Sequence, residues 1–153
     1  MGGRVMIMAA GTGGHVFPGL AVAAELMRRG HEVFWLGTPS GMENRLVPQA
    51  GIEMEVIDIQ GLRRNGPLRW LMAPMQLLRA AWQAFAVINR RKPAVVVGMG
   101  GFVSGPGGVA ARLMGIPLVI HEQNAVPGMA NQWLAGLAAR VLEAFPGSFK
   151  KSI

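Results

Sequence analysis

The most restrictive feature of this chain is the stretch of residues 8–18, which reads MAAGTGGHVFP. An apolar run precedes it, and a segment with helical periodicity follows it. Glycines between a strand and a helix let the backbone turn tightly and let a ligand approach closely. A helix that begins near Pro18 leaves unpaired N–H groups and partial positive charge at its first turn, which suits a phosphate or another anion. The stretch therefore predicts an α/β unit that binds a phosphate-bearing substrate, with His15 close enough to act on it.

Apolar segments with strand character alternate with helical segments along the whole chain. We expect strands at residues 4–9, 32–36, 53–59, 94–98, 117–121 and 140–143. We expect helices at residues 16–29, 42–50, 68–91 (bent or restarted at Pro74), from the second glycine-rich stretch to about 114, and near 127–135. This alternation predicts an α/β fold, a Rossmann-like doubly wound parallel sheet with helices on both faces. Residues 1–145 would form this domain, and residues 146–153 would begin a linker to a second domain that the sequence lacks.

Composition excludes several classes of protein. Hydrophobic residues make up 51% of the 153 residues, which is too many for a disordered chain. Cysteine is absent, so neither disulfides nor thiolate metal sites can form. We see no signal peptide, and no uninterrupted apolar run reaches the ~20 residues that span a bilayer. A soluble or peripheral protein is expected.

The formal net charge of +7 is unevenly distributed. Residues 59–121 carry eight basic and no acidic side chains, whereas residues 1–58 have a net charge of −2 and residues 122–153 a net charge of +1. Such a block indicates an anionic partner, which could be a nucleic acid, a phospholipid or a diphosphate substrate. The alternative is a basic face that is simply solvated.

Three polar segments follow predicted strands, at residues 10–15, 98–106 and 121–124. Ligands of such sheets bind beyond the carboxyl ends of the strands. Although the three segments are far apart in the sequence, the predicted fold brings them to one edge of the sheet. This convergence is the strongest argument from the residues for a functional site.

The first glycine-rich stretch resembles two nucleotide-binding motifs only in part. It matches the G-x-G of the dinucleotide fingerprint, but Val16 stands where the third glycine belongs. The second predicted strand ends in Trp35-Leu36-Gly37-Thr38, without an acidic residue to hold a ribose. No Gly-Lys-Ser/Thr sequence occurs, which excludes a Walker A loop. A nucleotide-binding Rossmann domain, as in a nucleotide-dependent oxidoreductase, remains an alternative, although the missing acidic residue speaks against it.

The second glycine-rich stretch, residues 98–108, reads GMGGFVSGPGG and holds six glycines in eleven residues. It could be a tight strand-to-helix connection. It could also be a second anion cradle, with backbone N–H groups and Ser104 as donors. Two such stretches at one sheet edge favour the cradle.

The polar run His121-Glu122-Gln123-Asn124 follows the fifth strand. Side-chain amides donate and accept hydrogen bonds, so Gln123 and Asn124 suit sugar hydroxyls. The alternative is helix capping by Asn124 together with an ion pair of Glu122. His15 is equally open: it can serve as a general base beside the anion site, or it can pack against its own loop.

The predicted helix over residues 68–91 is apolar on more faces than a sheet needs to cover. Its surplus apolar side chains lie near arginines, a combination that suits the surface of an anionic membrane. Core packing plus contact with the missing domain is the alternative. The predicted membrane contacts are Arg69, Trp70, Leu71, Met75, Leu78, Arg79 and Trp82.

Five motifs, taken together, resemble the MurG family of bacterial UDP-N-acetylglucosamine:lipid I N-acetylglucosaminyltransferases. They are residues 11–21 (GTGGHVFPGLA), 35–38 (WLGT), 61–63 (GLR), 98–108 and 121–124, in the family's order and spacing. The resemblance runs from about residue 4 to residue 149. It implies the N-terminal half of a two-domain GT-B glycosyltransferase of peptidoglycan synthesis, and thereby of cell-wall biogenesis, cell shape and cell division.

The resemblance also implies an activity. Members of the family transfer GlcNAc from UDP-GlcNAc to the C4 hydroxyl of the MurNAc sugar of lipid I, with inversion, and so make lipid II. Their N-terminal half mainly holds the acceptor and meets the anionic surface of the inner membrane peripherally, at its cytoplasmic face. The C-terminal donor domain carries most of the UDP-GlcNAc site. No metal, cofactor or nucleic acid is implied, and the 153 residues alone are expected to have little or no activity.

Carried over residue by residue, the resemblance places donor contacts on Thr12, Gly13, Gly14 and Asn124 and the catalytic base on His15, with Glu122 in support. Further predicted substrate contacts are Gln123, Gly100, Gly101 and Ser104. Two positions depart from the family pattern. Ala10 stands where a glycine is usual, and Phe102 stands where tyrosine is common, which removes one hydroxyl near the acceptor. A non-catalytic module that docks on anionic membranes remains the rival to an enzyme.

Overall fold

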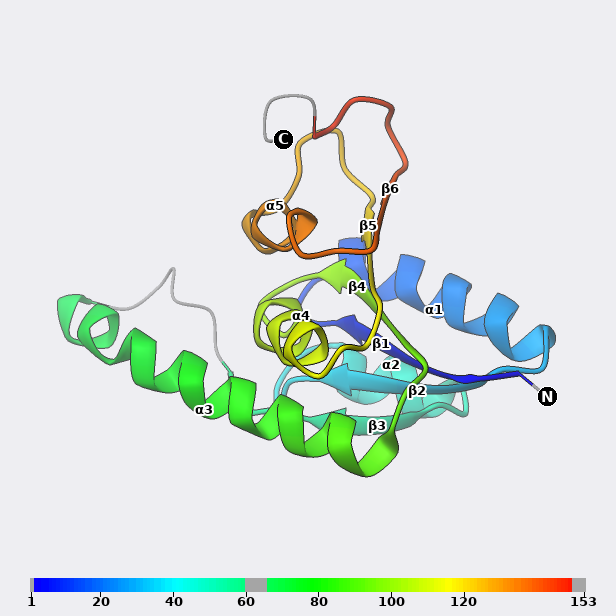
Figure 1. Ribbon diagram of the computed structural model, residues 1–153, viewed down its shortest axis with the longest axis horizontal. Coiled ribbons are helices and arrows are strands. Elements are labelled where there is room, and N and C mark those ends of the chain that lie inside the picture. Colours follow the sequence, from blue (N-terminus) through cyan, green and yellow to red (C-terminus); the bar gives the residue numbers. More distant parts are fainter. Residues whose placement is uncertain (1, 60–65, 150–153) are drawn as a thin grey trace.

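The structure, a computed structural model, describes residues 2–59 and 66–149 (Figure 1). The motif at residues 61–63 and the side chain of Arg69 lie outside the described part. The strands are β1 (Arg4–Ala9), β2 (Glu32–Gly37), β3 (Glu53–Val56), β4 (Val95–Gly100), β5 (Leu118–Glu122) and β6 (Arg140–Glu143). The helices are α1 (Gly13–Arg28), α2 (Glu43–Gln49), α3 (Pro67–Arg91), α4 (Ser104–Leu113) and α5 (Met129–Ala135).

The six strands form one parallel sheet in the order β3-β2-β1-β4-β5-β6. The predicted doubly wound, Rossmann-like sheet is confirmed. Strands β2 and β3 are added on one side of β1, and strands β4, β5 and β6 are added on its other side, so the strand order reverses between β1 and β4. The connections that leave these two strands therefore lead to opposite faces of the sheet, and the edge beyond their carboxyl ends is the place at which such sheets bind ligands in a crevice.

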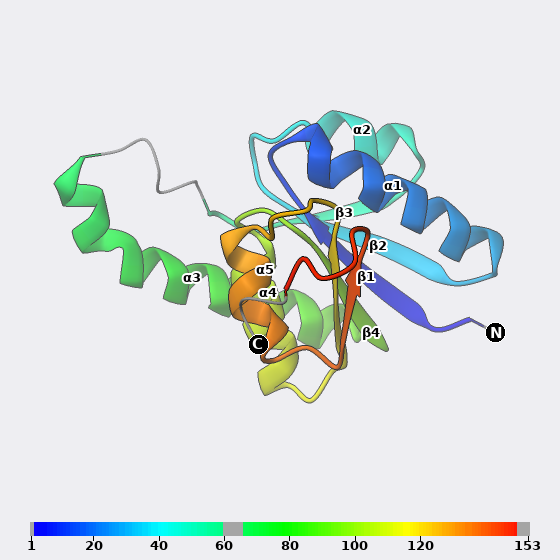
Figure 2. The same ribbon diagram turned by 90° about the horizontal axis from the view of Figure 1, so that it is seen from above.

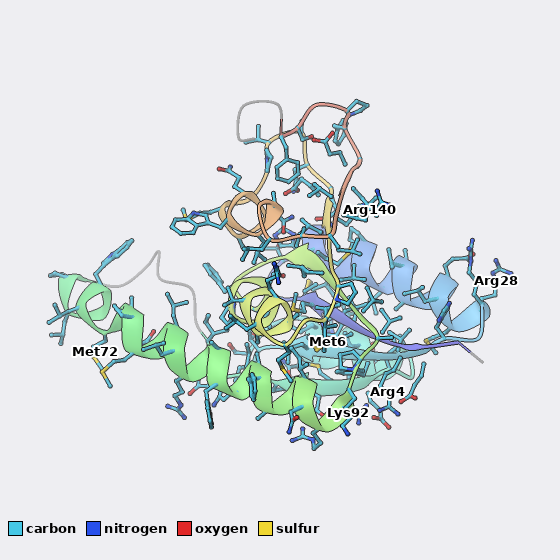
Figure 3. All side chains as sticks on the ribbon, viewed as in Figure 1. Arg4, Met6, Arg28, Met72, Lys92 and Arg140 are labelled. Carbon is cyan, nitrogen blue, oxygen red and sulfur yellow. The ribbon has the colours of Figure 1, made fainter. Side chains whose placement is uncertain are left out.

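Alternate side chains of β1 enter two separate cores. Val5 and Ile7 pack with α1 and α2, whereas Met6 and Met8 pack with α3, α4 and α5. Figure 2 shows α1 and α2 on one side of the sheet and α3, α4 and α5 on the other, and Figure 3 shows Met6 in the interior between the layers. Because both faces are covered, the central strands β1 and β4 are apolar nearly throughout, as predicted, with Arg4 at the start of β1 as the exception.

A glycine fixes the position of α1 on the sheet. A Cβ atom on Gly19 would lie 2.6 Å from the Trp35 ring, so only glycine allows the helix to lie this close. The buried Trp35 indole N–H donates to the carbonyl of Ala9, at 2.8 Å, at the very end of β1. Together these contacts place the first turn of α1 directly beyond β1.

Several element boundaries differ from the sequence-based expectation. Helix α1 begins at Gly13, so Gly14 and His15 belong to its first turn. Strand β4 continues to Gly100 and α4 begins at Ser104, which leaves only three residues of loop in the second glycine-rich stretch. Glycines in β4 make this possible, because a Cβ atom on Gly98 would lie 2.9 Å from the Ile120 side chain.

Helix α3 continues through Pro74 as one helix of 25 residues, so the helix does not restart there, which the sequence had left open beside a bend. A proline removes one N–H donor from the helix and leaves the carbonyl four residues earlier without it. Here that carbonyl belongs to the exposed Trp70, where water can replace the lost donor. In Figures 1 and 2 the N-terminal half of α3 projects beyond the rest of the molecule.

The first residues of the predicted linker fold back on the domain. The backbone N–H groups of Gly147 and Phe149 donate to the carboxylate of Glu143, at 2.9 and 2.8 Å. The Phe149 side chain is buried. The described start of this segment is therefore part of the packed structure, and the division at residue 145 stays a prediction.

Candidate active site

The three predicted loops meet at the carboxyl edge of the sheet, around the side chain of His15. Its ring lies against Gly100, where a Cβ atom would be 2.7 Å from ring atoms Nδ1 and Cε1. Its Nδ1 lies 3.3 Å from Oε1 of Gln123 in the third loop. One side chain thus contacts both of the other segments, at the point where the strand order reverses.

The first turn of α1 is open to a ligand. Within the described residues, no side chain caps this helix and no acidic residue lies in its first turn. The N–H groups of His15 and Val16 already bond to the carbonyl of Thr12, both at 3.1 Å. Thr12 and Gly14 are exposed. The turn therefore presents helix-end N–H groups and the positive end of the helix dipole to the cleft.

A buried carboxylate, which we did not predict from the sequence, accepts a hydrogen bond from this first loop. Glu43 is fully buried. Its Oε2 accepts the N–H of Gly11 at 3.1 Å, and its Oε1 accepts the N–H and the hydroxyl of Thr38 at 3.0 and 2.8 Å. Gly11 itself has φ 92°, a left-handed conformation that glycine adopts without strain. The sequence gives no signal for this contact, because an acidic residue at the start of a helix is ordinarily a favourable end charge.

In the second loop, glycines allow the backbone to lie close to the first loop. Gly100 and Gly101 have φ 114° and 86°, and a Cβ atom on Gly101 would lie 2.6 Å from the carbonyl oxygen of Ala10. Any larger residue would push the first loop and His15 away. Gly100 is itself buried. Its predicted contact with substrate stays a prediction, and its observed contact is with His15.

Ser104 faces the interior of the fold, contrary to its predicted role as a donor to the ligand. Its side chain is fully buried. The hydroxyl lies 3.0 Å from the carbonyl oxygen of Gly100 and 3.4 Å from that of Met8, and it accepts the N–H of Gly100 at 3.3 Å. It therefore joins the ends of β1 and β4, because a buried hydroxyl must find partners within the protein.

Glu122 organises the third loop. One carboxylate oxygen accepts the backbone N–H and the side-chain amide of Asn124, at 3.0 and 3.1 Å. The other accepts the N–H of Gly128 and the side-chain amide of Asn131, both at 3.0 Å. Burial by itself would raise the pKa of Glu122, but these hydrogen bonds outweigh it, and the pKa lies below its ordinary value. The carboxylate is thus charged and saturated, which fits a supporting role and not direct contact with a substrate.

A hydrogen-bonded chain joins two histidines through Gln123. The Gln123 Nε2 lies 2.9 Å from Nδ1 of His121 and 2.9 Å from the carbonyl oxygen of His121. Its Oε1 lies by Nδ1 of His15, as described above. His121 was singled out in the sequence only as a member of the polar run, and no role was assigned to it.

Several residues at this edge of the sheet are accessible. Asn124 and Phe102 are exposed. The carbonyl of Asn124 accepts the hydroxyl of Ser148 at 3.2 Å, so the chain near its described end also contacts the third loop. The structure thus brings His15, Gln123 and Gly100 into contact, and it places Thr12, Gly14 and Asn124 at the surface of the same edge.

Comparison with known proteins identifies the family. Residues 5–143 match the description "Glycosyltransferase family 28 N-terminal domain". The chain belongs to this family. The resemblance that the motifs suggested is thereby confirmed.

Close relatives of this family 28 domain are N-acetylglucosamine transferases. It is 58% identical over 152 residues to the UDP-N-acetylglucosamine--N-acetylmuramyl-(pentapeptide) pyrophosphoryl-undecaprenol N-acetylglucosamine transferase of Pseudomonas fluorescens (strain SBW25), covering 99% of this chain and 43% of that protein. It is 60% identical over 149 residues to the enzyme of that name from Shewanella denitrificans, covering 97% and 41%. The crystal structure of MurG from Acinetobacter baumannii superposes with a TM-score of 0.86 at 54% identity, covering 96% and 43%. The chain thus spans less than half the length of these relatives.

No group of three or more His, Asp or Glu side chains that could hold a metal ion occurs in residues 2–59 and 66–149 of the family 28 domain. A hollow of about 400 Å³ lies at the other end of β5, lined in part by Pro117, Leu118 and Ala139. It shares no residue with the site predicted from the sequence.

Helix α3 of the family 28 domain has two apolar faces. Ala80, Ala84, Val87 and Ile88 enter the core. On other sides, Trp70, Leu71, Met75, Leu78 and Trp82 are between 64% and 80% exposed, and Figure 3 shows Met72 on the projecting half of the helix. In the described part of the chain this is one helix long and apolar enough to cross a membrane, over Trp70–Arg91, with 28% of its most apolar window buried. Length and composition are weak evidence for a membrane span when one face of the helix packs into the core.

Ion pairs across the fold reduce the basic excess that the sequence places on α3. Arg79 pairs with Asp58 at 3.4 Å and Arg90 with Glu55 at 2.6 Å. Arg91 pairs with Glu53 and lies over the ring of Phe34. Acidic residues around β3 thus neutralise arginines that are separate from them in the sequence, including Arg79, one of the predicted membrane contacts.

Proposed function

We propose that this domain is the acceptor-binding half of an inverting glycosyltransferase that moves GlcNAc from UDP-GlcNAc to the C4 hydroxyl of MurNAc in lipid I, to form lipid II. The observation that carries the proposal is the meeting of three loops at the reversal of the strand order, where the ring of His15 lies at an uncapped helix end. The names of the close relatives support the same reaction. Because the chain covers about 43% of them, the activity belongs to a longer protein.

In the proposed reaction the acceptor hydroxyl oxygen bonds to the anomeric carbon of GlcNAc while the bond from that carbon to the β-phosphate oxygen breaks. The electron pair leaves with UDP, and the hydroxyl proton passes to His15. Attack from the face opposite the leaving group accounts for inversion. The second domain would bring the donor to the acceptor, and we expect residues 1–153 alone to transfer no GlcNAc.

We assign anion binding to the first turn of α1. Its N–H groups and helix dipole suit the diphosphate of either substrate, with Thr12, Gly13, Gly14 and Asn124 nearest the donor. The N-terminus of α4, which likewise starts without an acidic residue in its first turn, follows the carboxyl end of β4 at the same edge of the sheet. Gly101 would approach the acceptor diphosphate there.

Acceptor binding by the domain alone tests this proposal. A fluorescent lipid I analogue should bind residues 1–153 and raise the fluorescence anisotropy, and inorganic diphosphate should compete for the site. Gly14→Glu would place a negative charge at the first turn, so this variant should weaken binding of the diphosphate. Gly136→Glu, at an exposed glycine beyond α5, is the matched control. Equal binding by both variants would contradict the assignment.

We further propose that the projecting half of α3 places the protein peripherally on the anionic inner membrane, at its cytoplasmic face where UDP-GlcNAc is available. The exposed apolar side chains of α3 support this. Leu71→Glu with Leu78→Glu should abolish sedimentation with vesicles that contain anionic phospholipid. Met27→Glu, on α1 at the opposite side of the molecule, should not. Membrane binding without any binding of the lipid I analogue would favour the rival, a docking module without catalytic function.

A further inference from the structure

We propose that Gln123 is a positioning residue that holds the neutral His15 ring in the tautomer with its proton on Nδ1. The Nε2 atom then keeps its lone pair for the acceptor hydroxyl. The tautomer follows from hydrogen-bond geometry alone. Its catalytic meaning rests on the function proposed above.

The first step concerns which way the Gln123 amide faces. One end of the amide lies 2.9 Å from the backbone carbonyl oxygen of His121. A carbonyl oxygen only accepts hydrogen bonds, so the amide atom beside it must be the NH2 group. The opposite orientation would place two oxygens in contact. The carbonyl of His121 therefore fixes the orientation of the amide.

The second step concerns the other hydrogen of that NH2 group. It points to Nδ1 of His121, also at 2.9 Å. This nitrogen accepts, so a neutral His121 carries its proton on Nε2. Both hydrogens of the Gln123 amide are then engaged by one residue, and its oxygen is committed to the other side.

The third step leads to His15. The Gln123 Oε1 lies 3.3 Å from Nδ1 of His15, and an amide oxygen can only accept. The hydrogen bond forms only if His15 Nδ1 carries a proton. A neutral imidazole has a single N–H, so Nε2 of His15 is an acceptor.

The ring cannot easily turn away from this arrangement. Gly100 lies against Nδ1 and Cε1 of the ring, close enough that a Cβ atom would be 2.7 Å away. Glu122, the neighbour of Gln123, accepts hydrogen bonds from Asn124, Gly128 and Asn131, and these bonds hold the third loop in place. The position of Gln123 is therefore set by the loop, and that of His15 by Gln123 and Gly100.

This arrangement serves a base well. When Nε2 takes the proton of the acceptor hydroxyl, the ring becomes an imidazolium with N–H groups on both nitrogens. The hydrogen bond from Nδ1 to Gln123 persists through the step, so nothing on that side of the ring must reorganise. An Nε2–H tautomer would instead present a donor to the hydroxyl and could not accept its proton.

The test is ¹⁵N NMR of the histidine rings in residues 1–153, at a pH where the rings are neutral. The two ¹⁵N signals of each of the three rings are assigned with His15→Gln, His31→Gln and His121→Gln variants. We expect His15 to show a protonated Nδ1 and an unprotonated Nε2, and His121 to show the reverse. The opposite pattern at His15 in the unmodified chain would overturn the proposal, whatever the variants do.

Two substitutions sharpen the result. Gln123→Met keeps the length of the side chain but removes its acceptor, and we expect the His15 signals to shift toward the Nε2–H form or an average of both forms. Gln132→Met removes an exposed glutamine of α5 that bonds to the carbonyl of Pro127, and it should leave His15 unchanged. An Nδ1–H pattern that persists in Gln123→Met would contradict the role of Gln123.

Failure of the proposed function would look different. In a full-length chimera with the donor half of a relative, Gln123→Met should lower kcat about 10-fold or more and leave the KM for UDP-GlcNAc within about 2-fold, since a general base contributes ~10²–10⁴. If the tautomers are as expected but His15→Ala leaves kcat unchanged, the positioning stands and the base assignment fails.

Discussion

The crevice around His15 and the projecting half of α3 are built in opposite ways. In the crevice, polar side chains are held by partners from several segments: Glu43 by Gly11 and Thr38, Glu122 by Asn124 and Gly128. On α3, the outward side chains are large, apolar and mostly exposed. The first region fixes the positions of polar atoms, as the proposed chemistry requires, and the second exposes apolar area, as the proposed membrane contact requires.

The same contrast predicts very different responses to substitution. Changes in the crevice should alter stability and geometry together, because buried polar groups lose their partners. Substitutions on the outer face of α3 should leave the fold intact and alter only the binding of the protein to other surfaces.

The largest effect is expected at Glu43. Glu43→Leu leaves the N–H of Gly11 and the N–H and hydroxyl of Thr38 without their acceptor. With ~1–3 kcal/mol for each unsatisfied buried donor, the free energy of unfolding should fall by about 3 kcal/mol or more. Urea denaturation measures it. Glu53→Leu, at an exposed carboxylate of β3, is the control and should cost within about 0.5 kcal/mol. An equal loss of unfolding free energy in the two variants would contradict this difference between crevice and surface.

A second test adds a single methyl group beside His15. Gly100→Ala forces a left-handed φ of 114° on alanine and brings its Cβ atom within 2.7 Å of the ring. Strain of this kind costs ~1–3 kcal/mol. We expect lower stability in thermal denaturation and a displaced His15 ring, seen as changed ring ¹H shifts. Gly105→Ala, which meets open space in α4, should do neither.

The third test uses pH. The pKa of Glu122 is lowered in the folded state, so its carboxylate stabilises the fold above the unfolded pKa of ~4.3. That contribution is lost as the pH falls through the lower folded value. Glu122→Gln should therefore reduce the free energy of unfolding by ~1–3 kcal/mol at pH 7, and the gap from the unmodified chain should narrow in acid below pH ~4. A gap that is independent of pH would contradict the charged, hydrogen-bonded state.

The smallest effect is expected on the outer face of α3. Leu78→Glu should change the free energy of unfolding by no more than about 0.5 kcal/mol, because the side chain is 72% exposed. Ala84→Glu, six residues later on the core face, should unfold the domain, because it buries an unpaired charge. Circular dichroism with urea measures both. Similar stabilities of the two variants would show that α3 does not have separate faces.

Periodicity and glycine placement were enough to predict the strand and helix order and the three segments at the sheet edge. The apolar strands and the position of Gly11, Gly100 and Gln123 after them carry that information. What the sequence could not supply is the pairing of side chains across the fold. Ser104 lies within the second glycine-rich stretch and was expected at the ligand, but its hydroxyl joins β1 to β4.

Charge was misjudged for the same reason. The sequence groups Arg79, Arg90 and Arg91 into a basic block, whereas the fold sets Asp58, Glu55 and Glu53 beside them. A charge count along the sequence assumes that residues close in sequence are close in space. In a parallel sheet this fails, because residues from distant segments lie side by side. The apolar stripe of α3 thus carries the membrane proposal more than its arginines do.

The central claim is that His15 accepts the proton of the attacking hydroxyl. The direct measurement is kcat for GlcNAc transfer by His15→Ala in the full-length chimera, with labelled UDP-GlcNAc and a lipid I analogue. We expect kcat to fall by ~10²–10⁴, with the KM for UDP-GlcNAc within about 3-fold of its original value. An unchanged kcat would contradict it.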